Sequence, residues 1–167
     1  MAKRLDNNAI LSITATIVSI CALFVAAYQT ILMRQQQSAA VWPKLIIGHG
    51  YIENIGDSSF YHLNIRNVGI GPALIRQVRI ENRGHQFSTM EEYGRAILRR
   101  HHGLDSLQFD AVDLLPEDVI PANQTIRLFD TYRSRFARYF AASQEPFTIT
   151  VDYESVYGEK QQVRFSN

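Results

Sequence analysis

The sequence predicts a mainly β protein carried by one N-terminal transmembrane helix. Three observations lead to this fold class. An uncharged apolar run near the N-terminus is long enough to cross a bilayer. Several later segments alternate apolar and polar residues, which is typical of half-buried strands. Turn sequences rich in Gly, Asn, Asp and Pro separate those segments. We therefore expect an antiparallel β-sandwich, or a partly open barrel, of about seven strands with two short helices.

The composition is that of one folded domain with an appendage. The chain has 167 residues, 46% of them hydrophobic, and a formal net charge of +1. This balance excludes a disordered chain and gives no electrostatic argument for binding a nucleic acid polymer. The one cysteine, Cys21, lies in the apolar run, so we expect no disulfide and no cysteine-ligated zinc in the domain. We divide the chain into a tail (1–8), a transmembrane helix (9–33), a polar stalk (34–40) and a β domain (41–167).

Residues 9–33 form the predicted transmembrane helix. These 25 residues carry no charge, and as a helix they span roughly 37 Å, against the ~30 Å of a bilayer core. A cleaved signal peptide is the alternative, but its apolar region is usually about 7–15 residues long and ends at a small-residue cleavage site. This run is longer and continues into "QTILMRQQQ". We expect an uncleaved, single-pass anchor in the lipid bilayer.

The flanks of the helix bear on its orientation. Lys3, Arg4 and the chain amine precede it, whereas Arg34 and Lys44 follow it. The positive-inside rule favours a cytoplasmic N-terminus and a domain outside the cytoplasm, by a margin of about one charge. The opposite orientation stays open.

Small residues line one face of this helix, at Ala15, Ser19, Ala22 and Ala26. Their spacing of four, three and four residues lets two helix backbones approach closely, which predicts a homo-oligomer. The alternative is that Ala and Ser are simply common in such helices.

The stalk leads into the domain through "VWP". Proline disfavours the α region for the residue before it, so the helix ends here. We expect Trp42 to lie in the domain core rather than at the membrane interface.

Two segments alternate most clearly, "FYHLNIRN" and "FTITVDYES". Their inward residues are predicted to be Tyr61, Leu63 and Ile65 in the first, and Phe147, Ile149, Val151 and Tyr153 in the second. The second is expected to form a hairpin with "KQQVRF", because Gly158 in "VYGE" supplies the positive φ that such a loop needs.

Two other segments predict helices. In "STMEEYGRAILRRHHG", Ser88 and Glu91 have capping-box spacing, and we expect a helix from Thr89 to His102 that buries one apolar side. In "DTYRSRFARYFAAS", aromatic residues recur at helical spacing, which predicts a short helix from Thr131 to Ala142. The segment between the two helices is expected to be mostly extended.

The stretch "NIRNVGIGPALI" contains two glycines that resemble part of a phosphate-binding loop. A dinucleotide fingerprint needs a third glycine and a following helix, whereas Gly69 and Gly71 precede Pro72 and a predicted strand. We expect a tight turn in which the glycines adopt unusual φ values.

Two basic groups, one on each predicted helix, are the candidate ligand-binding residues. Such groups bind a small anionic ligand, a lipid headgroup or an acidic partner. The alternative is an ordinary solvated helix face. The residues are Arg95, Arg99 and His102 in the first helix, and Arg133, Arg135 and Arg138 in the second.

No catalytic or metal-binding constellation is recognisable. His101, His102 and Asp105 are close in sequence, but adjacent side chains on a helix point about 100° apart and rarely share one ion. Metalloprotease, hydrolase and phosphate-loop motifs are missing from the sequence. We expect a protein that is not an enzyme and holds no metal or cofactor.

The stretches "YQTILMRQQQSAAVWPKLIIG", "LNIRNVGIGPALI" and "FTITVDYESVYGEKQQVRF" together resemble a loose family of small bacterial membrane proteins. The resemblance covers most of the chain and implies a single N-terminal helix carrying a β-sandwich-like domain at the bacterial inner membrane. It implies no activity and no site residue. The resemblance implies an aromatic residue at position 161, and the chain departs from it by having Gln161 there.

Two hypotheses of function follow. The first is a membrane-anchored, non-enzymatic interaction module that engages a protein partner or an envelope component. The second is a membrane sensor-effector, whose domain binds a small nucleotide-like anion and which acts through oligomerisation of its helix.

Overall fold

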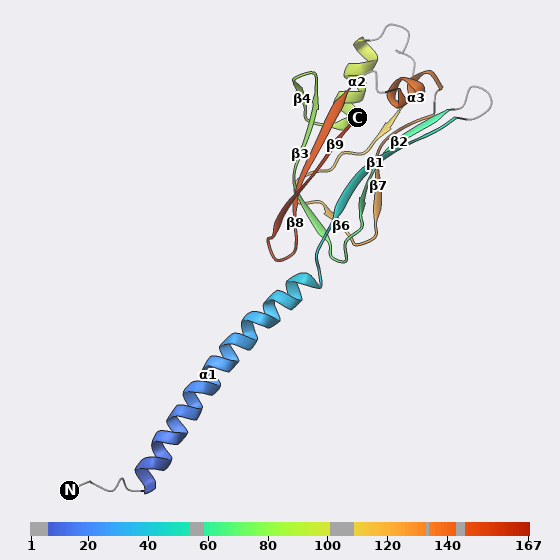
Figure 1. Ribbon diagram of the computed structural model, residues 1–167. Helices are drawn as coiled ribbons and strands as arrows, with labels where there is room; N and C mark the ends of the chain where they lie inside the picture. Colours follow the sequence, from blue (N-terminus) through green and yellow to red (C-terminus); the bar gives the residue numbers. More distant parts are fainter. Residues whose placement is uncertain (1–6, 54–58, 101–108, 133, 143–145) are drawn as a thin grey trace. The chain divides into compact units, whose positions relative to one another are not determined.

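The structure is a computed structural model. It describes residues 7–53, 59–100, 109–132, 134–142 and 146–167, with side chains at all of these except 38–39 and 134–136. The chain divides into two compact units, Met1–Ala40 and Val41–Asn167. The first contains helix α1 (Asn7–Ala39), and the second contains the β domain (Figure 1).

Helix α1 includes the predicted transmembrane segment (9–33) and the predicted stalk (34–40) as far as Ala39. In the described part of the chain, Asn7–Gln37 is the one helical segment that is long and apolar enough to cross a membrane. Length and composition are the basis of this statement, and a signal sequence near the N-terminus would meet the same two conditions.

The β domain is a sandwich of two antiparallel sheets, as predicted, and not a closed barrel (Figure 1). The first sheet has the spatial order β1 (Leu45–Ile52), β2 (Phe60–Asn67), β7 (Thr125–Thr131) and β5 (Asp110–Ala111). The second has the order β4 (His85–Phe87), β3 (Ala73–Asn82), β8 (Phe147–Glu154) and β9 (Lys160–Ser166), and β6 (Val119–Ile120) pairs with the start of β3.

The described residues thus form nine strands, where the sequence predicted about seven. The additional strands include β5 and β6, which are two residues long and lie in the segment predicted to be an extended connection. Alternation cannot identify strands this short, because it needs several residues of one period.

The core lies between the sheets and is built from the residues that alternation assigned to it. On β2, Tyr61, Leu63 and Ile65 are buried, and on β8 the alternate residues from Phe147 to Tyr153 are buried. Phe140 closes one end of the core, with its ring centroid 5.4 Å from that of Tyr61. Both predicted inward faces are therefore confirmed.

Helix α2 (Met90–Arg100) begins one residue later than predicted. Thr89 Oγ1 accepts a hydrogen bond from the Glu92 backbone N–H at 3.0 Å, and Glu92 returns the contact by accepting from the Ser88 backbone N–H at 2.8 Å. The N-cap is therefore Thr89 and not Ser88, and Glu92 takes the return bond from the residue before the cap, which is a variant of the capping box. Met90, the first helical residue, is buried, and its backbone N–H donates to Asp113 Oδ1 at 2.7 Å.

Helix α3 (Ser134–Ala141) is shorter than the predicted helix from Thr131 to Ala142. Thr131 is instead the last residue of β7, where it pairs with Tyr61 and is fully buried. Tyr132 is not helical either, and its ring stacks on Phe60. Strand pairing and burial at Thr131 outweigh the helical spacing of the aromatic residues. Figure 1 shows α2 and α3 at the same end of the sandwich.

The turn between β2 and β3 needs glycine for a reason other than the predicted one. Neither Gly69 nor Gly71 has a positive φ. A Cβ on Gly71 would lie 1.7 Å from the carbonyl oxygen of Val41, and one on Gly69 would lie 2.4 Å from that of Trp42. The glycines therefore permit close approach of two backbone segments.

Asn67 holds the same segments together. Its buried side chain accepts hydrogen bonds from the backbone N–H groups of Lys44 (3.2 Å) and Gly69 (3.0 Å), and donates to the carbonyls of Gly71 (2.8 Å) and Ile120 (2.9 Å). The side-chain amide thus accepts two hydrogen bonds and donates two. This clamp fixes the start of the domain against the turn between β2 and β3 and against β6.

Trp42 was predicted to lie in the core, and this prediction is wrong. Its side chain is 44% exposed, while its carbonyl oxygen accepts hydrogen bonds from Ile70 N–H at 3.0 Å and Gly71 N–H at 3.3 Å. At Trp42 the backbone carbonyl makes the close contacts, and the indole ring lies at the surface of the domain.

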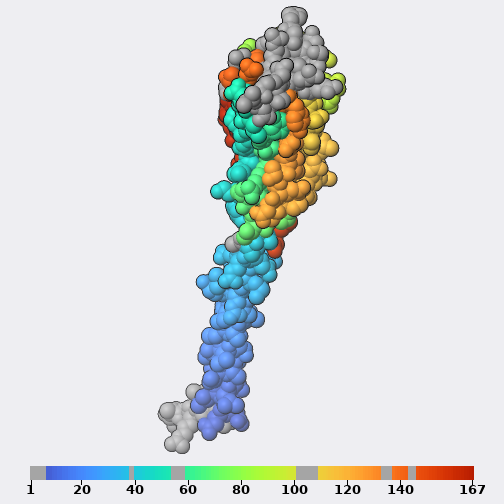
Figure 2. Space-filling view, turned by 90° about the vertical axis from the view of Figure 1, so that its right-hand side faces the viewer, coloured from blue at the N-terminus to red at the C-terminus, as the bar shows by residue number. Residues whose placement is uncertain are grey.

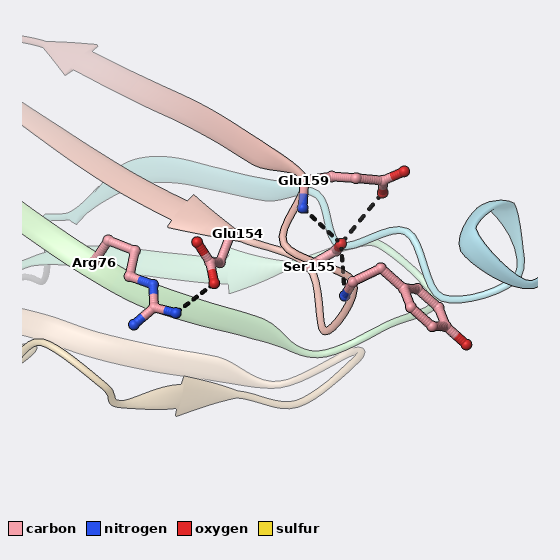
Figure 3. Close-up of polar contacts among 5 residues, drawn as sticks. Arg76, Glu154, Ser155 and Glu159 are labelled. Atoms are coloured by element: carbon pink, nitrogen blue, oxygen red, sulfur yellow. Dashed lines mark hydrogen bonds and ion pairs between the residues drawn. The ribbon is translucent and has the colours of Figure 1, made fainter. Parts of the chain in front are cut away.

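The hairpin between β8 and β9 forms as predicted, with Gly158 at φ 82°. Figure 3 shows Ser155 at its base, where the hydroxyl oxygen accepts from Tyr157 N–H (3.2 Å) and Glu159 N–H (3.3 Å). Gln161, at the position where an aromatic residue was expected, accepts from the buried Tyr153 hydroxyl at 2.9 Å.

Candidate functional site on the outer face of the first sheet

The outer face of the first sheet gathers polar and aromatic side chains across β2 and β7. Because β2 alternates, Phe60, His62 and Asn64 point away from the core. Antiparallel register places His62 opposite Asp130 and Asn64 opposite Arg127. We call these five residues together with Tyr132 the β2–β7 face. Figure 2 looks onto this side of the domain, where β2 is green and β7 is orange.

Asp130 is the least expected member of the β2–β7 face, because it is 6% exposed although it lies outside the sandwich core. One carboxylate oxygen, Oδ2, accepts a hydrogen bond from Arg127 Nη1 at 3.1 Å. The other, Oδ1, is buried and has no hydrogen-bond partner among the described residues. A buried acceptor in this condition costs about 1–3 kcal/mol or more.

Two further polar atoms of the β2–β7 face are in the same condition. His62 Nδ1 and Asn64 Oδ1 are also buried and lack a partner within the described parts of the chain. Buried polar atoms in native proteins are nearly always paired with protein or with ordered water. Three unpaired atoms on neighbouring residues make this face the candidate site, and because the atoms have no exposed surface, an additional molecule would reach them after a movement of the surrounding side chains.

A stack of rings adjoins these atoms. The rings of Tyr132 and Phe60 are stacked with centroids 4.8 Å apart, and Phe60 in turn lies 5.1 Å from the ring of His62. The Arg127 guanidinium carbon is 5.4 Å from the centre of the Phe60 ring, in cation–π range. Tyr132 is 59% exposed, so the outer end of the stack faces solvent.

Strand β1, which adjoins β2, has glycines and therefore no side chains at the two positions next to the β2–β7 face. Gly48 and Gly50 pair with Asn64 and His62, and a Cβ on Gly48 would meet nothing within 4 Å. At Gly50 the His62 ring itself occupies the space, because a Cβ there would lie 2.4 Å from His62 Cε1. The β2–β7 face is therefore open beside Gly48, whereas the His62 ring fills the space at Gly50.

Electrostatics keep His62 neutral near pH 7. Burial lowers the pKa of His62 below its usual 6.5, and the positive charge of Arg127 lowers that pKa further. The Asp130 carboxylate acts in the opposite direction and His49 in the same direction as Arg127, both to a smaller extent. A neutral imidazole has one donor and one acceptor nitrogen, so Nδ1 can take either role.

The second sheet carries an open polar hollow of about 790 Å³. It is lined by Arg76, Gln77, Asp152, Tyr153, Glu154, Lys160, Gln161 and Gln162. Its two carboxylates are already bound: Glu154 pairs with Arg76 (Figure 3), and Asp152 accepts from Arg79 at 2.7 Å and from Gln162 at 2.6 Å. Internal pairing of this kind is typical of a solvated sheet face, so the hollow is a weaker candidate.

The structure places the side chains of three of the six predicted basic residues, and all three are exposed. Arg95 and Arg99 are exposed on α2, and Arg95 pairs with Glu91 one turn away. Arg138 is exposed near the end of α3. The remaining three predicted residues cannot be placed: His102 and Arg133 lie outside the described residues, and so does the side chain of Arg135.

The other predicted positions have simple surroundings. Ala15, Ser19, Ala22 and Ala26 all lie on the exposed surface of α1, and the Ser19 hydroxyl donates to the Ala15 carbonyl at 2.8 Å within the helix. Cys21 is a free, exposed thiol on the same helix.

For metal binding, no group of three His, Cys, Asp or Glu side chains arranged to hold an ion occurs within the residues that the structure covers. His101, His102 and Asp105 belong to 101–108, outside those residues.

Fold and sequence together define a β-sandwich domain preceded by one helix that is apolar and long enough for a membrane. The chain belongs to the family described as "Domain of unknown function (DUF8453)", which matches residues 8–166. A comparison with curated proteins found no match. The family covers both the helix and the sandwich, and its description assigns no activity.

Proposed function

We propose that this protein is a non-enzymatic binding module anchored in the bacterial inner membrane by α1. The observation that supports it best is the unpaired Oδ1 of Asp130, a nearly buried carboxylate oxygen beside His62 Nδ1 and Asn64 Oδ1. Because these atoms have no exposed surface, a partner that docks on the β2–β7 face must displace neighbouring side chains to reach them, and it then supplies the missing hydrogen bonds and recovers the free energy that the atoms lose by burial.

The chemistry of the unpaired atoms selects the partner. Asp130 Oδ1 and Asn64 Oδ1 are both acceptors, so the partner presents N–H donors, such as the amide, ammonium or guanidinium groups of a protein loop. The Tyr132–Phe60 stack offers an apolar flank to the same loop. We therefore favour a protein partner over a small anion at this face.

Site-specific photocrosslinking in intact membranes tests the proposal. A photoreactive phenylalanine replaces Tyr132, which is exposed and already aromatic, and the matched control carries it at Arg164, on exposed β9 of the other sheet. We expect a protein adduct from position 132 that is absent from position 164. Changing Asp130 to Asn should weaken the adduct at least several-fold while the domain still melts cooperatively.

Two results would contradict the proposal. Equal crosslinking from positions 132 and 164 would mean that the β2–β7 face is not selective. An adduct at position 132 that is indifferent to Asp130→Asn, in a protein that remains folded, would mean that the unpaired carboxylate oxygen does not take part in binding.

A small-anion sensor is the second candidate, supported by the exposure of Arg99 and Arg138 on helices that cover the same end of the sandwich. Thermal-shift screening of the full chain in detergent against nucleotides tests it. A shift that disappears on Arg99→Ala supports the sensor, and a flat screen excludes the nucleotides tried.

Topology and assembly are part of the proposal. We place the β domain in the periplasm, so alkaline phosphatase fused after Asn167 should be active and a fluorescent protein at the same site should be dark. The reverse pattern would place the domain in the cytoplasm. If α1 self-associates through Ala15, Ser19, Ala22 and Ala26, then Ala22→Ile should reduce chemical crosslinking between copies, whereas Leu23→Ile should leave it unchanged.

A further inference from the structure

Exposed apolar side chains gather at one end of the β domain. We call this set the apolar rim: Trp42, Val68, Ile70, Val119, Val156 and Tyr157, which are between 38% and 65% exposed. They come from the start of the domain, the turn after β2, strand β6 and the turn after β8. Figure 1 shows these segments at the end of the sandwich opposite to α2 and α3.

Hydrogen bonds and register place the members of the rim together. Val68 N–H donates to the Lys44 carbonyl at 2.8 Å, and Ile70 N–H donates to the Trp42 carbonyl at 3.0 Å. Leu74, at the start of β3, pairs with Val119 on one side and with Glu154 on the other, just before the turn that holds Val156 and Tyr157.

Backbone contacts hold the turn between β2 and β3 in a conformation that exposes part of the rim. Gly69 and Gly71 let the turn press against residues 41–44, and the Asn67 side chain clamps both segments. Ile70, between the two glycines, is consequently held 65% exposed. A large apolar side chain fixed outward in this way points to something that covers it.

Chain connectivity indicates a lipid surface. Trp42 follows the last residue of α1, Ala39, by three residues, so connectivity alone keeps Trp42 within about 10 Å of the end of that helix. Residues 34–39 extend the helix by about 9 Å beyond the apolar run, whereas the headgroup layer is about 5–8 Å thick. The difference between the helix extension and the headgroup thickness is within the reach of a Trp or Tyr side chain. Both residue types are enriched at membrane interfaces, where one end of the ring is apolar and the other is wet.

Charge does not explain the rim. The ionisable side chains at this end nearly balance, so electrostatic attraction to anionic lipid is not the driving force. They include Lys44, Arg66, Arg76 and Lys160 against Glu117, Asp118, Glu154 and Glu159.

We infer that the apolar rim seats in the interfacial layer of the bilayer and rests the β domain on the membrane surface. The inference rests on the proposed function, in that α1 must span the membrane. The occupant of the rim is the zwitterionic lipid interface, and burial of apolar area drives the contact.

Two native residues can report on the position of the rim and on the anchoring of α1, because Trp42 and Cys21 are each the one residue of their type. The full chain is reconstituted into zwitterionic vesicles that contain lipid spin-labelled either at the headgroup or deep in the acyl chain. We expect Trp42 fluorescence to be quenched more strongly by the headgroup label than by the deep label. Trp42 that escapes the headgroup label and is fully quenched by aqueous iodide would overturn the inference.

Cys21 separates a failure of the anchor from a failure of the rim. If α1 spans the bilayer, a membrane-impermeant maleimide does not reach Cys21 in intact vesicles. Labelling of Cys21 would refute the anchor itself. Protected Cys21 with unquenched Trp42 would refute the rim alone.

Substitutions at the rim test its apolar character. Ile70→Ser and Tyr157→Ser should each reduce headgroup-label quenching of Trp42 by about half, whereas the control Ile52→Ser, 50% exposed at the other end of β1, should not. Unchanged quenching in both rim variants would overturn the proposal. Quenching that appears when anionic lipid is added, and at no other time, would also overturn it, because the contact would then be electrostatic.

Discussion

Replacing Gly71 with Ala tests whether close backbone approach decides the structure of the turn between β2 and β3. A Cβ at this position would lie 1.7 Å from the Val41 carbonyl oxygen, 2.2 Å from its carbonyl carbon and 2.8 Å from its Cα. All three atoms are backbone, so no side-chain rotation relieves the overlap. Restoring a normal contact of about 3.5 Å requires the Val41 segment to move by about 1.8 Å.

Such a movement has a cost that can be estimated. Forcing atoms into a packed region typically costs about 1–3 kcal/mol. The displaced segment also holds the Trp42 carbonyl, which accepts from Ile70 N–H and Gly71 N–H, and each bond that is lost contributes about 1 kcal/mol. We expect Gly71→Ala to lower the free energy of unfolding by roughly 2–4 kcal/mol, which is a decrease in Tm of roughly 8–16 °C for a domain of this size.

The matched control is Gly48→Ala on β1. Its Cβ would meet nothing within 4 Å and its φ is not positive, so the substitution should leave Tm unchanged or raise it slightly. Differential scanning calorimetry of the full chain in detergent micelles measures both. The reasoning is refuted if the two variants melt within about 2 °C of each other.

Three other substitutions have definite expectations. Asn67→Ala removes four hydrogen bonds of a fully buried side chain and should cost roughly 2–4 kcal/mol in denaturant unfolding; a cost below that of an average surface substitution would contradict the clamp. Thr89→Ala should cost about 1 kcal/mol because it removes the helix cap, whereas Ser88→Ala, which contributes its backbone N–H, should cost close to nothing. The pKa of His62 is lowered by folding, so the unfolded chain takes up the proton first, and stability should fall as the pH drops through about 6.5 and level off below the folded pKa. His62→Gln should remove this part of the acid dependence, and identical pH profiles for both proteins would exclude it.

Period-two alternation predicted the strands that build the core, because a half-buried strand must place its apolar residues on one side. Tyr61, Leu63 and Ile65 are buried for this reason, as are Phe147 and its alternate partners. Local turn chemistry predicted the β8–β9 hairpin at Gly158. These features depend on a few neighbouring residues, which one sequence displays directly.

Predictions that required a tertiary contact were less successful. Trp42 was predicted to be a core residue because it lies nine residues past Met33, the end of the apolar run, yet the contacts of its segment are made by backbone atoms. Thr131 fitted a helical pattern, but pairing with Tyr61 keeps it in β7. In each case the deciding partner is distant in sequence.

The β2–β7 face could not be found from the sequence for the same reason. His62, Asn64 and Asp130 look like ordinary solvent-facing residues of alternating strands. They become candidate binding residues because the register brings Asp130 beside His62, and because one buried polar atom of each residue lacks a hydrogen-bond partner among the described residues. The arginines of the helices were the predicted binding residues, because they are close together along the chain, and the structure leaves Arg95 and Arg99 on an exposed surface.

The pairing of β3 with β8 has a consequence for biosynthesis. Arg76 and Glu154, which meet across these strands, are 78 residues apart, so β3 leaves the ribosome long before its neighbour exists. Helix α1 is available for targeting from the beginning, whereas the second sheet waits for the last stretch of the chain. During that interval Ile75 and Ile80 and an unpaired strand edge are open to other nascent chains. A product terminated before Phe147 would keep that edge permanently, which makes premature termination a direct route to aggregation.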